Sequence, residues 1–362
     1  MKTLLISYGD VNYDGRLRSL ITVFEKISDI NTFTRGVQDS SDGRYVCNEN
    51  YLSFISKCIK FGKEHKNQGY DILVLDNRKA TIPGIFLRKI LHPRFTIQDC
   101  RELYLSREIK YLTGKIGCYF EKYMVKKADI VICANSERAQ LMQEEYKLKN
   151  TPLTYENLRK LEYSSEEGFN KAKKKLSEYV SDDEIRLLTS SGCSVKRTND
   201  VLVENLKKVN RKCHLLLVGN STDKDKEVII SLAKKDRVNK FTILGQLNQD
   251  ELKYLISQCH IGIVNYGQYD TNNKMCASGK LYEFLYEGIP VVTTTNPPLK
   301  RLCDKEKIGV ADDMYYKGIN YILDNYDTYL CAAKEFTKNN TIESNDKKLI
   351  AEIMNIIKGS NK

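Results

Sequence analysis

The chain has 362 residues, and at about 150 residues per domain this length predicts two domains, each able to bury a sizeable core. Its composition, 41% hydrophobic and 29% charged, excludes a disordered chain and a multi-span membrane protein. The 58 Lys and Arg residues against 47 Asp and Glu give a net charge of +11, which suits an anionic partner, but no nucleic-acid-binding motif is present and no nucleic acid is expected as a partner.

The first half of the chain alternates predicted strands with predicted helices. Short apolar strands, of the kind buried in a parallel sheet, are expected at residues 3–7, 70–75, 95–97 and 129–134. Amphipathic helices are expected at 15–27, 51–64 and 103–127. The last helix is long, and its apolar residues recur every three or four positions with the spacing of a core-facing side: Leu105, Ile109, Leu112, Ile116, Tyr119 and Tyr123.

The pattern breaks between residues 151 and 184, where Thr151-Pro152 and a charged stretch with three consecutive lysines indicate a connection between domains. Strands are expected again at 185–189, 214–218, 241–244, 261–264 and 290–294, with helices between them and a last helix at 347–357. Two successive β/α units predict two Rossmann-like domains, residues 1–160 and 185–340, joined by 161–184 and followed by 341–362.

The cysteines and histidines indicate neither disulfides nor a metal site. The 11 cysteines are scattered without a C-x-x-C pair, and the N-terminus reads as a strand rather than a signal peptide. Reduced thiols in a cytoplasmic protein are therefore expected. The four histidines, at positions 65, 92, 214 and 260, cluster neither with one another nor with close cysteine pairs, so no metal is expected. No cofactor is expected either.

Residues 265–298 carry the most informative motif. Ser278 can cap a helix, and Gly288 with Pro290 ends it, which predicts a short helix over residues 279–287. Lys280 and Glu283 share one side of its first turn, where Lys280 and the free N–H groups attract phosphate. Glu283 is placed to accept hydrogen bonds from a ribose diol, so that the two residues together suit a nucleotide sugar. The alternative is a surface i,i+3 pair, worth only about 0.2–0.5 kcal/mol.

The stretch from Ser278 to Val292, SGKLYEFLYEGIPVV, resembles the donor-site signature of retaining GT-B glycosyltransferases of the family-4 type, a Lys-x-x-Glu helix followed by Gly-x-Pro-Val-Val. Four other segments resemble the family in the same order: 8–18, 99–104, 127–136 and 191–200. The resemblance implies an α/β fold of the GT-B type, with two Rossmann-like β/α/β domains that face each other across a cleft. It also implies that 1–160 bind the acceptor, that 185–340 bind the donor, and that the helix in 341–362 packs back on the first domain.

Site residues follow from the same resemblance. Arg197, with Lys196 beside it, and Lys280 would hold the donor diphosphate, and Glu283 the ribose. The Gln246–Leu247 backbone would face the base. The remaining donor-binding positions are Gly192, Gly219, Gly245, Gln246, Leu247, Ser278, Gly279 and Leu281. For Gly219 an ordinary turn at a strand end is the alternative.

The sequence departs from the family pattern at two places. Met275 stands where many members have a Glu that touches the donor sugar, and no histidine lies in a strand-end loop of the first half, where the family often has one. After the strand at 70–75 the sequence is Asp76-Asn77-Arg78, and His92 is the remaining histidine candidate. No catalytic residue is therefore assigned, apart from Lys280 and Arg197 as groups that stabilise the leaving diphosphate.

The reaction implied is transfer of a hexosyl-type group from a UDP- or GDP-linked sugar with retention of configuration. The leaving diphosphate carries negative charge that must be stabilised. No convincing Asp-x-Asp motif is present, since Asp182-Asp183 precedes a strand rather than ending one. Lys280, Arg197 and the helix N-terminus could supply the charge without a metal. In such enzymes the leaving phosphate is thought to help deprotonate the acceptor, so no protein base is named.

The first domain is expected to bind a glycan or lipid-diphosphate acceptor through Asp14, Gly15 and Arg16, which follow the first strand. The alternative is a helix start, with Asp14 as cap and Gly15 as turn. Cations beside apolar residues in this domain suit an anionic membrane surface, and a solvated helix face is the alternative. These cations are Arg88, Lys89, Arg94, Lys110, Lys115, Lys122, Lys126 and Lys127.

The expected function is a glycosyltransferase of surface polysaccharide synthesis, located in the cytoplasm and peripherally on the inner face of the cell membrane. Two alternatives from other classes stay open. One is a GT-B scaffold or partner subunit that binds a nucleotide sugar without transferring it. The other is a nucleotide-sugar epimerase, which would need carboxylates and a histidine around the sugar.

Overall fold

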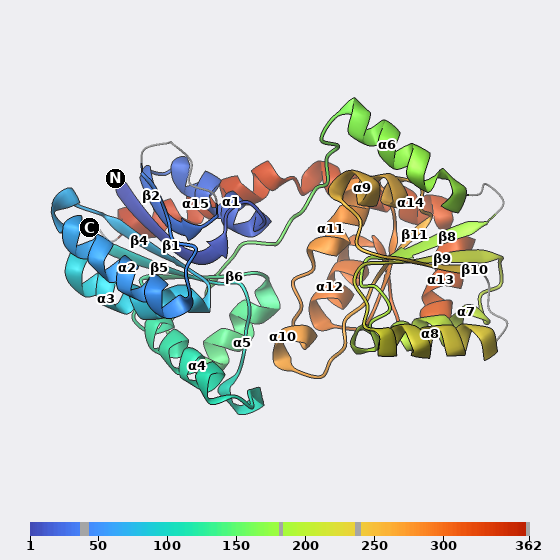
Figure 1. Ribbon diagram of the computed structural model, residues 1–362, viewed down its shortest axis with the longest axis horizontal. Helices are drawn as coiled ribbons and strands as arrows, with labels where there is room; N and C mark the ends of the chain where they lie inside the picture. Colours follow the sequence, from blue (N-terminus) through green and yellow to red (C-terminus); the bar gives the residue numbers. More distant parts are fainter. Residues whose placement is uncertain (37–42, 181–183, 236–239, 360–362) are drawn as a thin grey trace. The chain divides into compact units, whose positions relative to one another are not determined.

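The computed structural model describes residues 1–36, 43–180, 184–235 and 240–359, and the chain divides into two compact units. The first unit consists of Met1–Asn157 and Ile342–Lys362, and the second of Leu158–Thr341. Each unit is a parallel β-sheet with helices on both faces (Figure 1). The expectation of two Rossmann-like α/β units is confirmed. Asp182 and Asp183 lie outside the described residues.

Within the described residues, the sheet of the first unit has seven strands in the order β3-β2-β1-β4-β5-β6-β7, all paired in parallel. The strands are β1 (Lys2–Asp10), β2 (Asp29–Arg35), β3 (Arg44–Val46), β4 (Ile72–Asp76), β5 (Phe95–Cys100), β6 (Ile130–Cys133) and β7 (Leu153–Thr154). The apolar strands β1, β4, β5 and β6 form the middle of the sheet and were expected from the sequence. β2, β3 and β7 were not, because strands toward an edge need less apolar sequence.

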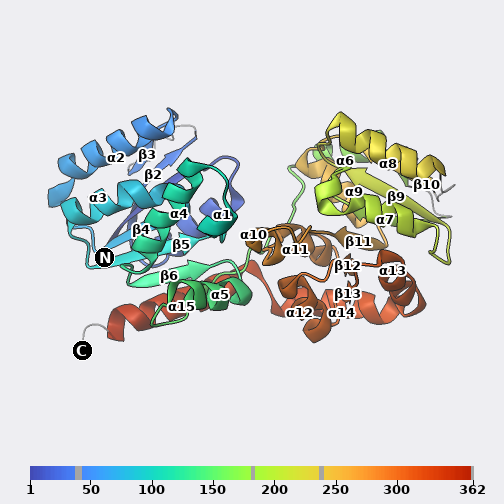
Figure 2. The same cartoon turned by 90° about the horizontal axis from the view of Figure 1, so that it is seen from below.

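Helices cover both faces of this sheet, since successive side chains of a strand point to opposite faces. Leu5, Val74 and Ile97 pack with α1 (Gly15–Glu25) and α15 (Ile342–Gly359). Leu4, Leu73 and Leu75 pack with α2 (Tyr51–Glu64) and α3 (Thr81–Leu91) on the other face (Figure 2). α5 (Ser136–Tyr146) packs against β6.

The C-terminal helix α15 belongs to the first unit through apolar and polar contacts. Leu349, Ile353 and Ile357 are buried in the same core as α1. Asp346 accepts a hydrogen bond from the hydroxyl of Tyr155 at 2.7 Å, and its other oxygen lies 3.4 Å from the ammonium of Lys26. The end of the chain therefore helps to close the core of its first domain.

The helix expected over residues 103–127 is shorter in the structure and turns its apolar side outward. α4 covers Leu112–Val125, and the segment before it contains only a short 3-10 helix at Ser106–Glu108. Its buried residues are Cys118, Glu121, Met124 and Val125. The apolar series expected to face the core is instead exposed from its third member on: Leu112, Ile116, Tyr119 and Tyr123. This prediction was wrong because periodicity identifies an apolar side of a helix but not what that side contacts.

In the second unit, the part of the chain that the structure describes forms a sheet of six parallel strands in the order β10-β9-β8-β11-β12-β13. The strands are β8 (Ile185–Thr189), β9 (Cys213–Val218), β10 (Lys240–Leu244), β11 (Ile261–Val264), β12 (Val291–Thr293) and β13 (Gly309–Ala311). The helices are α6 (Glu166–Leu176), α7 (Asn199–Leu206), α8 (Asp223–Lys235), α9 (Gln249–Ser257), α10 (Thr271–Lys274), α11 (Gly279–Tyr286), α12 (Pro297–Glu306), α13 (Tyr315–Asp324) and α14 (Tyr326–Asn339).

This sheet also separates two cores. Leu187, Leu215 and Ile263 point to one face, which α7, α8 and α13 cover. Leu188 and Leu216 point to the other face, which α9, α11, α12 and α14 cover. Residues on both faces are buried, so the loops at the carboxyl edge of the sheet are the part of the unit that presents polar groups.

Candidate functional site

The strand order of the second unit reverses beside β8, because β9 pairs with one side of β8 and β11 with the other. The connections from β8 and β11 therefore leave the sheet on opposite faces and diverge. In open α/β sheets this divergence is where ligands bind. Residues 190–198 follow β8, Asn265 and Tyr266 follow β11, and α11 begins farther along from β11.

The first turn of α11 forms as the sequence predicts. Ser278 is the N-cap, and its hydroxyl oxygen accepts a hydrogen bond from the N–H of Leu281 at 3.4 Å. Gly279 is the first residue of the helix, and Gly288 follows its end with φ of +73°. The side chain of Leu281 is buried in the core, so at the start of the helix Leu281 can offer a ligand only its backbone.

Lys280 reaches from α11 to the loop after β8. Its ammonium donates a hydrogen bond to the carbonyl oxygen of Ser190, and its side chain is half-buried. The pKa of Lys280 is lowered to about 8, mainly by burial and also by the nearby charge of Arg197, and Glu283 partly opposes this. A cation held in this way is short of negative charge, and an anionic ligand would supply it.

Glu283 is buried, with an exposed fraction of 2%, and one carboxylate oxygen accepts from Nε of Arg159 at 2.9 Å. Burial raises the pKa of Glu283, and the charges of Arg159 and Lys280 partly oppose this. The ion pairs of the described residues include Arg159 with Glu283 but not Lys280 with Glu283. The alternative of a surface Lys280–Glu283 pair is therefore wrong, because the carboxylate is inside the unit and bound to a different cation.

Arg197 adds a second cation at the start of α11. It ends the short 3-10 helix Val195–Arg197, and its guanidinium carbon lies 3.9 Å from the ring centroid of Tyr266. Burial raises the pKa of Tyr266, while Arg197 and a hydrogen bond to Ser278 favour the ionised form. The neighbouring Lys196 is exposed. Arg197, Lys280 and the N-terminus of α11 thus converge, and this combination suits a diphosphate.

A buried polar network fixes the loop after β8. The amide of Asn199 donates to the hydroxyl of Ser191 at 3.0 Å and to the carbonyl of Gly192 at 2.9 Å. Asn265, after β11, donates to the side-chain oxygen of Asn199 at 2.7 Å and accepts from Ser191 at 2.9 Å. Sequence reasoning missed this network and Arg159. A polar residue directly after a buried strand was the available signal for Asn265, but none marks Arg159.

The glycines after β8 and β9 lie against each other. Gly192 has φ of +63°, and a Cβ atom there would lie 2.4 Å from the carbonyl oxygen of Asn220. Gly219 has φ of +125°, and a Cβ there would lie 3.3 Å from the backbone nitrogen of Gly192. Both positions therefore require glycine, and the two loops present backbone groups where side chains would not fit.

The expected base-contacting residues lie beside the same loops. The N–H of Gly219 donates to the carbonyl oxygens of Leu244 and Gly245, each at 3.1 Å. Gln246 is exposed and accepts a hydrogen bond from the amide of Asn220 at 3.1 Å. Leu247 packs partly into the core. The residues expected to bind the sugar donor, from the loops and from α11, thus all lie in the second unit, around the carboxyl edge of its sheet.

In the first unit, Asp14 and Gly15 form the helix start that was the alternative to acceptor contact. Asp14 is the N-cap of α1 and accepts from the N–H of Leu17 at 3.0 Å. Arg16 donates to both carboxylate oxygens of Asp99, at 2.7 and 3.1 Å, and to the carbonyl of Tyr155 at 2.8 Å. Its side chain is only 7% exposed, so Arg16 joins β5 to the segment after β7.

A hollow of about 220 Å³ lies at the switch point of this sheet, at the carboxyl ends of β1 and β4. Arg101 forms ion pairs with Asp76 and Asp14 there, and the hydroxyl of Ser7 donates to Asp76 at 2.5 Å. Burial raises the pKa of Asp76 to about 6, and Arg101 partly opposes this. The other residues that line this hollow are Tyr8, Gly9, Asn77, Arg78, Lys79 and Glu102.

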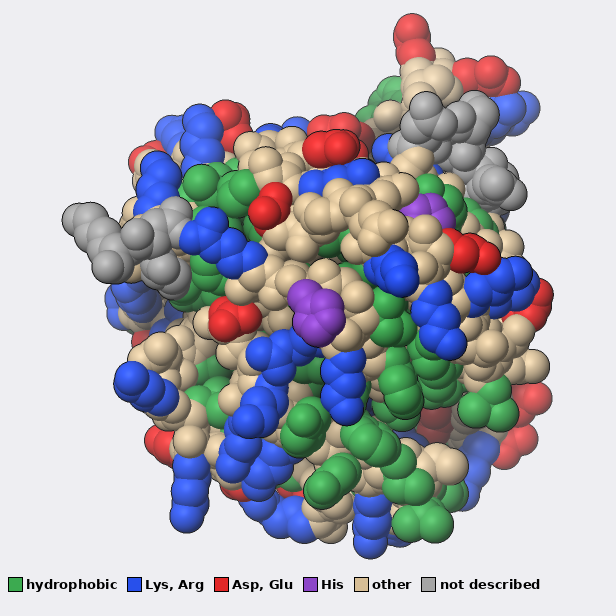
Figure 3. Space-filling view, turned by 90° about the vertical axis from the view of Figure 1, so that its left-hand side faces the viewer, with side chains coloured by type: hydrophobic (Ala, Val, Ile, Leu, Met, Phe, Trp, Pro, Cys, Tyr) green, Lys and Arg blue, Asp and Glu red, His purple; other side chains and the backbone are tan. Residues whose placement is uncertain are grey.

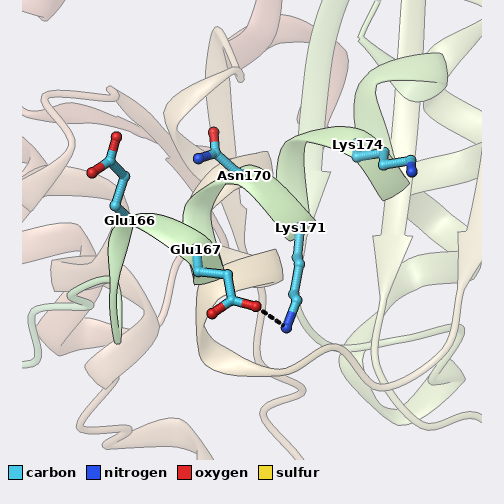
Figure 4. A pocket seen from close by; sticks show the side chains of 5 residues that line it. All are labelled: Glu166, Glu167, Asn170, Lys171 and Lys174. Carbon is cyan, nitrogen blue, oxygen red and sulfur yellow. Dashed lines mark ion pairs between the residues drawn. The ribbon is translucent and has the colours of Figure 1, made fainter.

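Another hollow, of about 360 Å³, lies along the surface of α6 (Figure 4). Its lining side chains are Glu166, Glu167, Asn170, Lys171 and Lys174, and all of them come from this one helix. Glu167 and Lys171 form an exposed i,i+4 ion pair at 2.6 Å. Because no second element contributes to it, this hollow is a groove between surface side chains and not a site built by the fold.

None of the four histidines lies at either carboxyl edge. His214 is the second residue of β9 and His260 precedes β11, so both lie toward the amino ends of their strands. Burial lowers the pKa of His214 to about 4 and also lowers that of His260. His65 and His92 are C-caps of α2 and α3. Across the described residues, no group of three or more His, Cys, Asp or Glu side chains is arranged to hold a metal ion.

Comparisons with known proteins show the fold. No protein-family model matches the sequence, and no curated protein matches it. A glycosyltransferase from Rickettsia africae is 17% identical with a TM-score of 0.73, covering 99% of this chain and 98% of that chain. HepE from Anabaena, in complex with UDP and glucose, is 14% identical with a TM-score of 0.71, covering 98% and 100%. A UDP-N-acetylglucosamine 2-epimerase is 11% identical with a TM-score of 0.60, covering 99% and 96%. The expected GT-B fold is confirmed, and at these identities the likeness carries no activity.

Proposed function

We propose that this chain is a glycosyltransferase that takes a sugar from a nucleoside-diphosphate sugar. The observation that supports this best is the convergence of Lys280, Arg197 and the N-terminus of α11 at the switch point of the second sheet. Two cations and a helix N-terminus match the charge of a diphosphate. Burial and the nearby charge of Arg197 lower the pKa of Lys280, and a bound diphosphate would favour its charged form.

In this proposal the donor lies along the carboxyl edge of the second sheet. Lys280 and Arg197, with Lys196 nearby, bind the diphosphate, and Glu283 accepts from the ribose hydroxyls. Gly245 has open space beside it, and Gly192 and Gly219 would present backbone groups to the nucleotide. HepE, a neighbour of similar fold, has been crystallised with UDP and with UDP-glucose, so UDP is the first nucleotide to test and GDP the second.

The reaction we propose is metal-independent transfer with retention of configuration, in the manner of the family-4 enzymes that residues 278–292 resemble. Charge accumulates on the diphosphate as the sugar–oxygen bond breaks, and Lys280 and Arg197 are placed to stabilise it. Loss of one such electrostatic contact typically lowers the rate about 100–1,000-fold. We assign no protein base.

For the acceptor we propose a glycan or a lipid diphosphate, bound by the first unit near Asp14. The hollow at the ends of β1 and β4 offers Arg78 and Lys79 to an anionic group, and Asp14 lines it. The guanidinium of Arg16 already donates to Asp99 and Tyr155, so Arg16 would not contact the acceptor but would hold the carboxyl edge of the first sheet in place. With such an acceptor, the role that we propose is surface polysaccharide synthesis, in the cytoplasm at the inner face of the cell membrane.

The structural likeness to an epimerase makes epimerisation of a nucleotide sugar the second candidate. The placement of the histidines disfavours it, because none lies at a carboxyl edge where a sugar would bind. A scaffold that binds a nucleotide sugar without transferring it is the third.

One experiment separates the three. The protein is incubated with UDP-glucose or another UDP- or GDP-sugar, with and without a lipid-linked or oligosaccharide acceptor, and the products are resolved by chromatography. Release of nucleoside diphosphate that requires the acceptor supports the transferase. An epimerised nucleotide sugar without acceptor supports the epimerase. Nucleotide binding in a thermal-shift panel of UDP, GDP, ADP and CMP, without turnover of any donor, supports the scaffold and contradicts the transferase.

A further inference from the structure

The outward side of α4 is apolar, which is unusual for a helix on the surface of a folded unit. Leu112 is 73% exposed, Ile116 43%, Tyr119 68% and Tyr123 43%. At about 100° per residue these four positions fall within about 60° of one another, so they form one stripe along the helix. We call these four residues the α4 stripe. A helix that merely covered its unit would turn such a stripe toward the core.

The α4 stripe is bordered by cations and not by acids. Lys115, Lys122 and Lys126 recur at i, i+7 and i+11, so they line one border of the stripe, and all three are exposed. Between residues 109 and 128 the sequence has a single acidic residue, Glu121, which is buried on the opposite side of α4. The exposed surface of this helix therefore carries positive charge and apolar area together.

Neighbouring elements extend the same character. Tyr111, directly before α4, is 78% exposed. α3 packs beside α4 and exposes Phe86 and Lys89. In Figure 3 the lower part of the face, at the height where Figure 1 draws α4, shows green hydrophobic side chains among blue Lys and Arg. Exposed apolar area rimmed by polar groups marks an interaction surface.

We propose that the α4 stripe docks this protein on an anionic lipid bilayer. α4 has 14 residues, too few to cross the bilayer, and no described helix has the length and apolar character to do so. Such a helix lies flat in the interface, with its apolar side in the acyl boundary and its lysines on the headgroups. Tyr119 and Tyr123 suit the headgroup level, because the tyrosine ring is apolar and its hydroxyl is polar. A protein partner is disfavoured, because the lysine border has no acidic counterpart on this helix and complements a uniformly anionic surface.

The inner side of α4 connects this surface to the proposed acceptor hollow, and this step rests on the proposed function. A guanidinium nitrogen of Arg78, which lines the hollow, donates to the sulfur of Cys118 at 3.3 Å. Arg78 also crosses α4 at Gly117, where a Cβ atom would lie 3.3 Å from its side chain. A bilayer bound on the outer side of α4 is therefore one helix thickness away from the hollow. This geometry favours a lipid-linked acceptor over a free glycan.

The test uses the full chain and sedimentation with vesicles of phosphatidylcholine, with and without phosphatidylglycerol. The wild type should bind the anionic vesicles and should be released as salt rises from about 0.1 M to about 1 M, where the Debye length falls from about 10 to about 3 Å. The variant Lys115→Gln/Lys122→Gln should bind about 10–30-fold more weakly at low salt. The variant Ile116→Gln/Tyr119→Gln should bind the vesicles about tenfold or more weakly at any salt concentration, because it removes apolar area from the α4 stripe.

Matched controls lie on α2 of the same unit. Leu52 is 78% exposed, and Leu52→Gln should leave vesicle binding unchanged. Lys60→Gln/Lys63→Gln removes two other exposed lysines and should also have no effect beyond the general loss of net charge. Equal binding to neutral and anionic vesicles, or equal losses in the α2 and α4 variants, would overturn the proposal. So would a dimer in solution that Ile116→Gln/Tyr119→Gln dissociates, because the stripe would then face a second copy.

Failure of docking and failure of the proposed function give different results. The α4 variants lie outside the donor site, so the thermal shift caused by UDP should persist in both. Vesicle binding without any nucleotide response would leave the docking surface in place and contradict the transferase. A nucleotide response with acceptor-dependent release of nucleoside diphosphate, but without vesicle binding, would support the transferase and contradict the docking surface.

Discussion

Replacement of Lys280 by Met should make the free protein more stable while it weakens nucleotide binding. Met keeps much of the aliphatic length and removes the charge. Burial, together with the charge of Arg197, lowers the pKa of Lys280 from 10.5 to about 8, and at about 1.36 kcal/mol per pKa unit this corresponds to about 3 kcal/mol of destabilisation by the charged form. Solvent screening of a half-buried group reduces that figure. The variant also loses the hydrogen bond to Ser190, which lowers the expected gain in unfolding free energy by about 1 kcal/mol. We expect a net gain in unfolding free energy of about 1 kcal/mol at pH 7.

The gain should depend on pH in a definite direction. Below about pH 8 Lys280 is charged in both the folded and the unfolded chain, so the destabilisation is fully present. As the pH rises from about 8 to 10.5 the folded chain releases the proton and the destabilisation disappears. The difference between variant and wild type, measured by urea unfolding, should therefore be largest at pH 7 and should have largely disappeared by pH 10.

The same variant should lose affinity for UDP, measured by isothermal titration. In the wild type, affinity should fall about tenfold between pH 7 and pH 9, because the charged fraction of Lys280 falls from about 0.9 to about 0.1. The Lys280→Met variant should bind UDP more weakly than the wild type at pH 7, and its affinity should not show the fall between pH 7 and pH 9 that comes from the titration of Lys280. Transfer should slow about 100–1,000-fold.

Lys300 provides the matched control, because it is exposed on α12 and pairs with Asp304 at 2.7 Å. Lys300→Met should change neither UDP affinity nor its pH dependence. Full UDP affinity in Lys280→Met, or a variant that no longer folds, would refute the assignment of Lys280 to a diphosphate site.

Two further substitutions test other parts of the structure. Glu283→Gln keeps one acceptor oxygen but loses a charge-assisted hydrogen bond, so nucleotide affinity should fall by about 1.5–3 kcal/mol; an unchanged affinity would contradict the ribose role. Arg101→Met leaves the buried carboxylate of Asp76 without its cation and should lower the unfolding free energy by about 3–5 kcal/mol at pH 8. Because the pKa of Asp76 is already raised to about 6, protonation should relieve this loss toward pH 5, and urea unfolding that shows the same loss at both pH values would contradict the reasoning.

Local patterns in the sequence were sufficient for the middle strands of both sheets and for the helix that carries the proposed site. Strands such as β4 and β9 are mostly apolar, and the interior of a parallel sheet buries such strands on both faces. Ser278 and Gly288 mark the two ends of α11, because capping and a left-handed turn are decided by residues next to each other in the chain. The convergence of Arg197 with Lys280 was expected only through the family resemblance, since about 80 residues separate them.

Only the tertiary structure decided what each of these side chains contacts. The spacing of Lys280 and Glu283 permitted a mutual pair, yet the fold buries Glu283 against Arg159, which lies more than 100 residues earlier. The apolar period of α4 was visible in the sequence, but Met124 and Val125 of the opposite side fill the core and leave Tyr119 in solvent. Periodicity measures how side chains are distributed around one helix, whereas burial depends on which other elements pack against it. That choice is made by contacts between residues distant in sequence, and these contacts exist only in the folded chain.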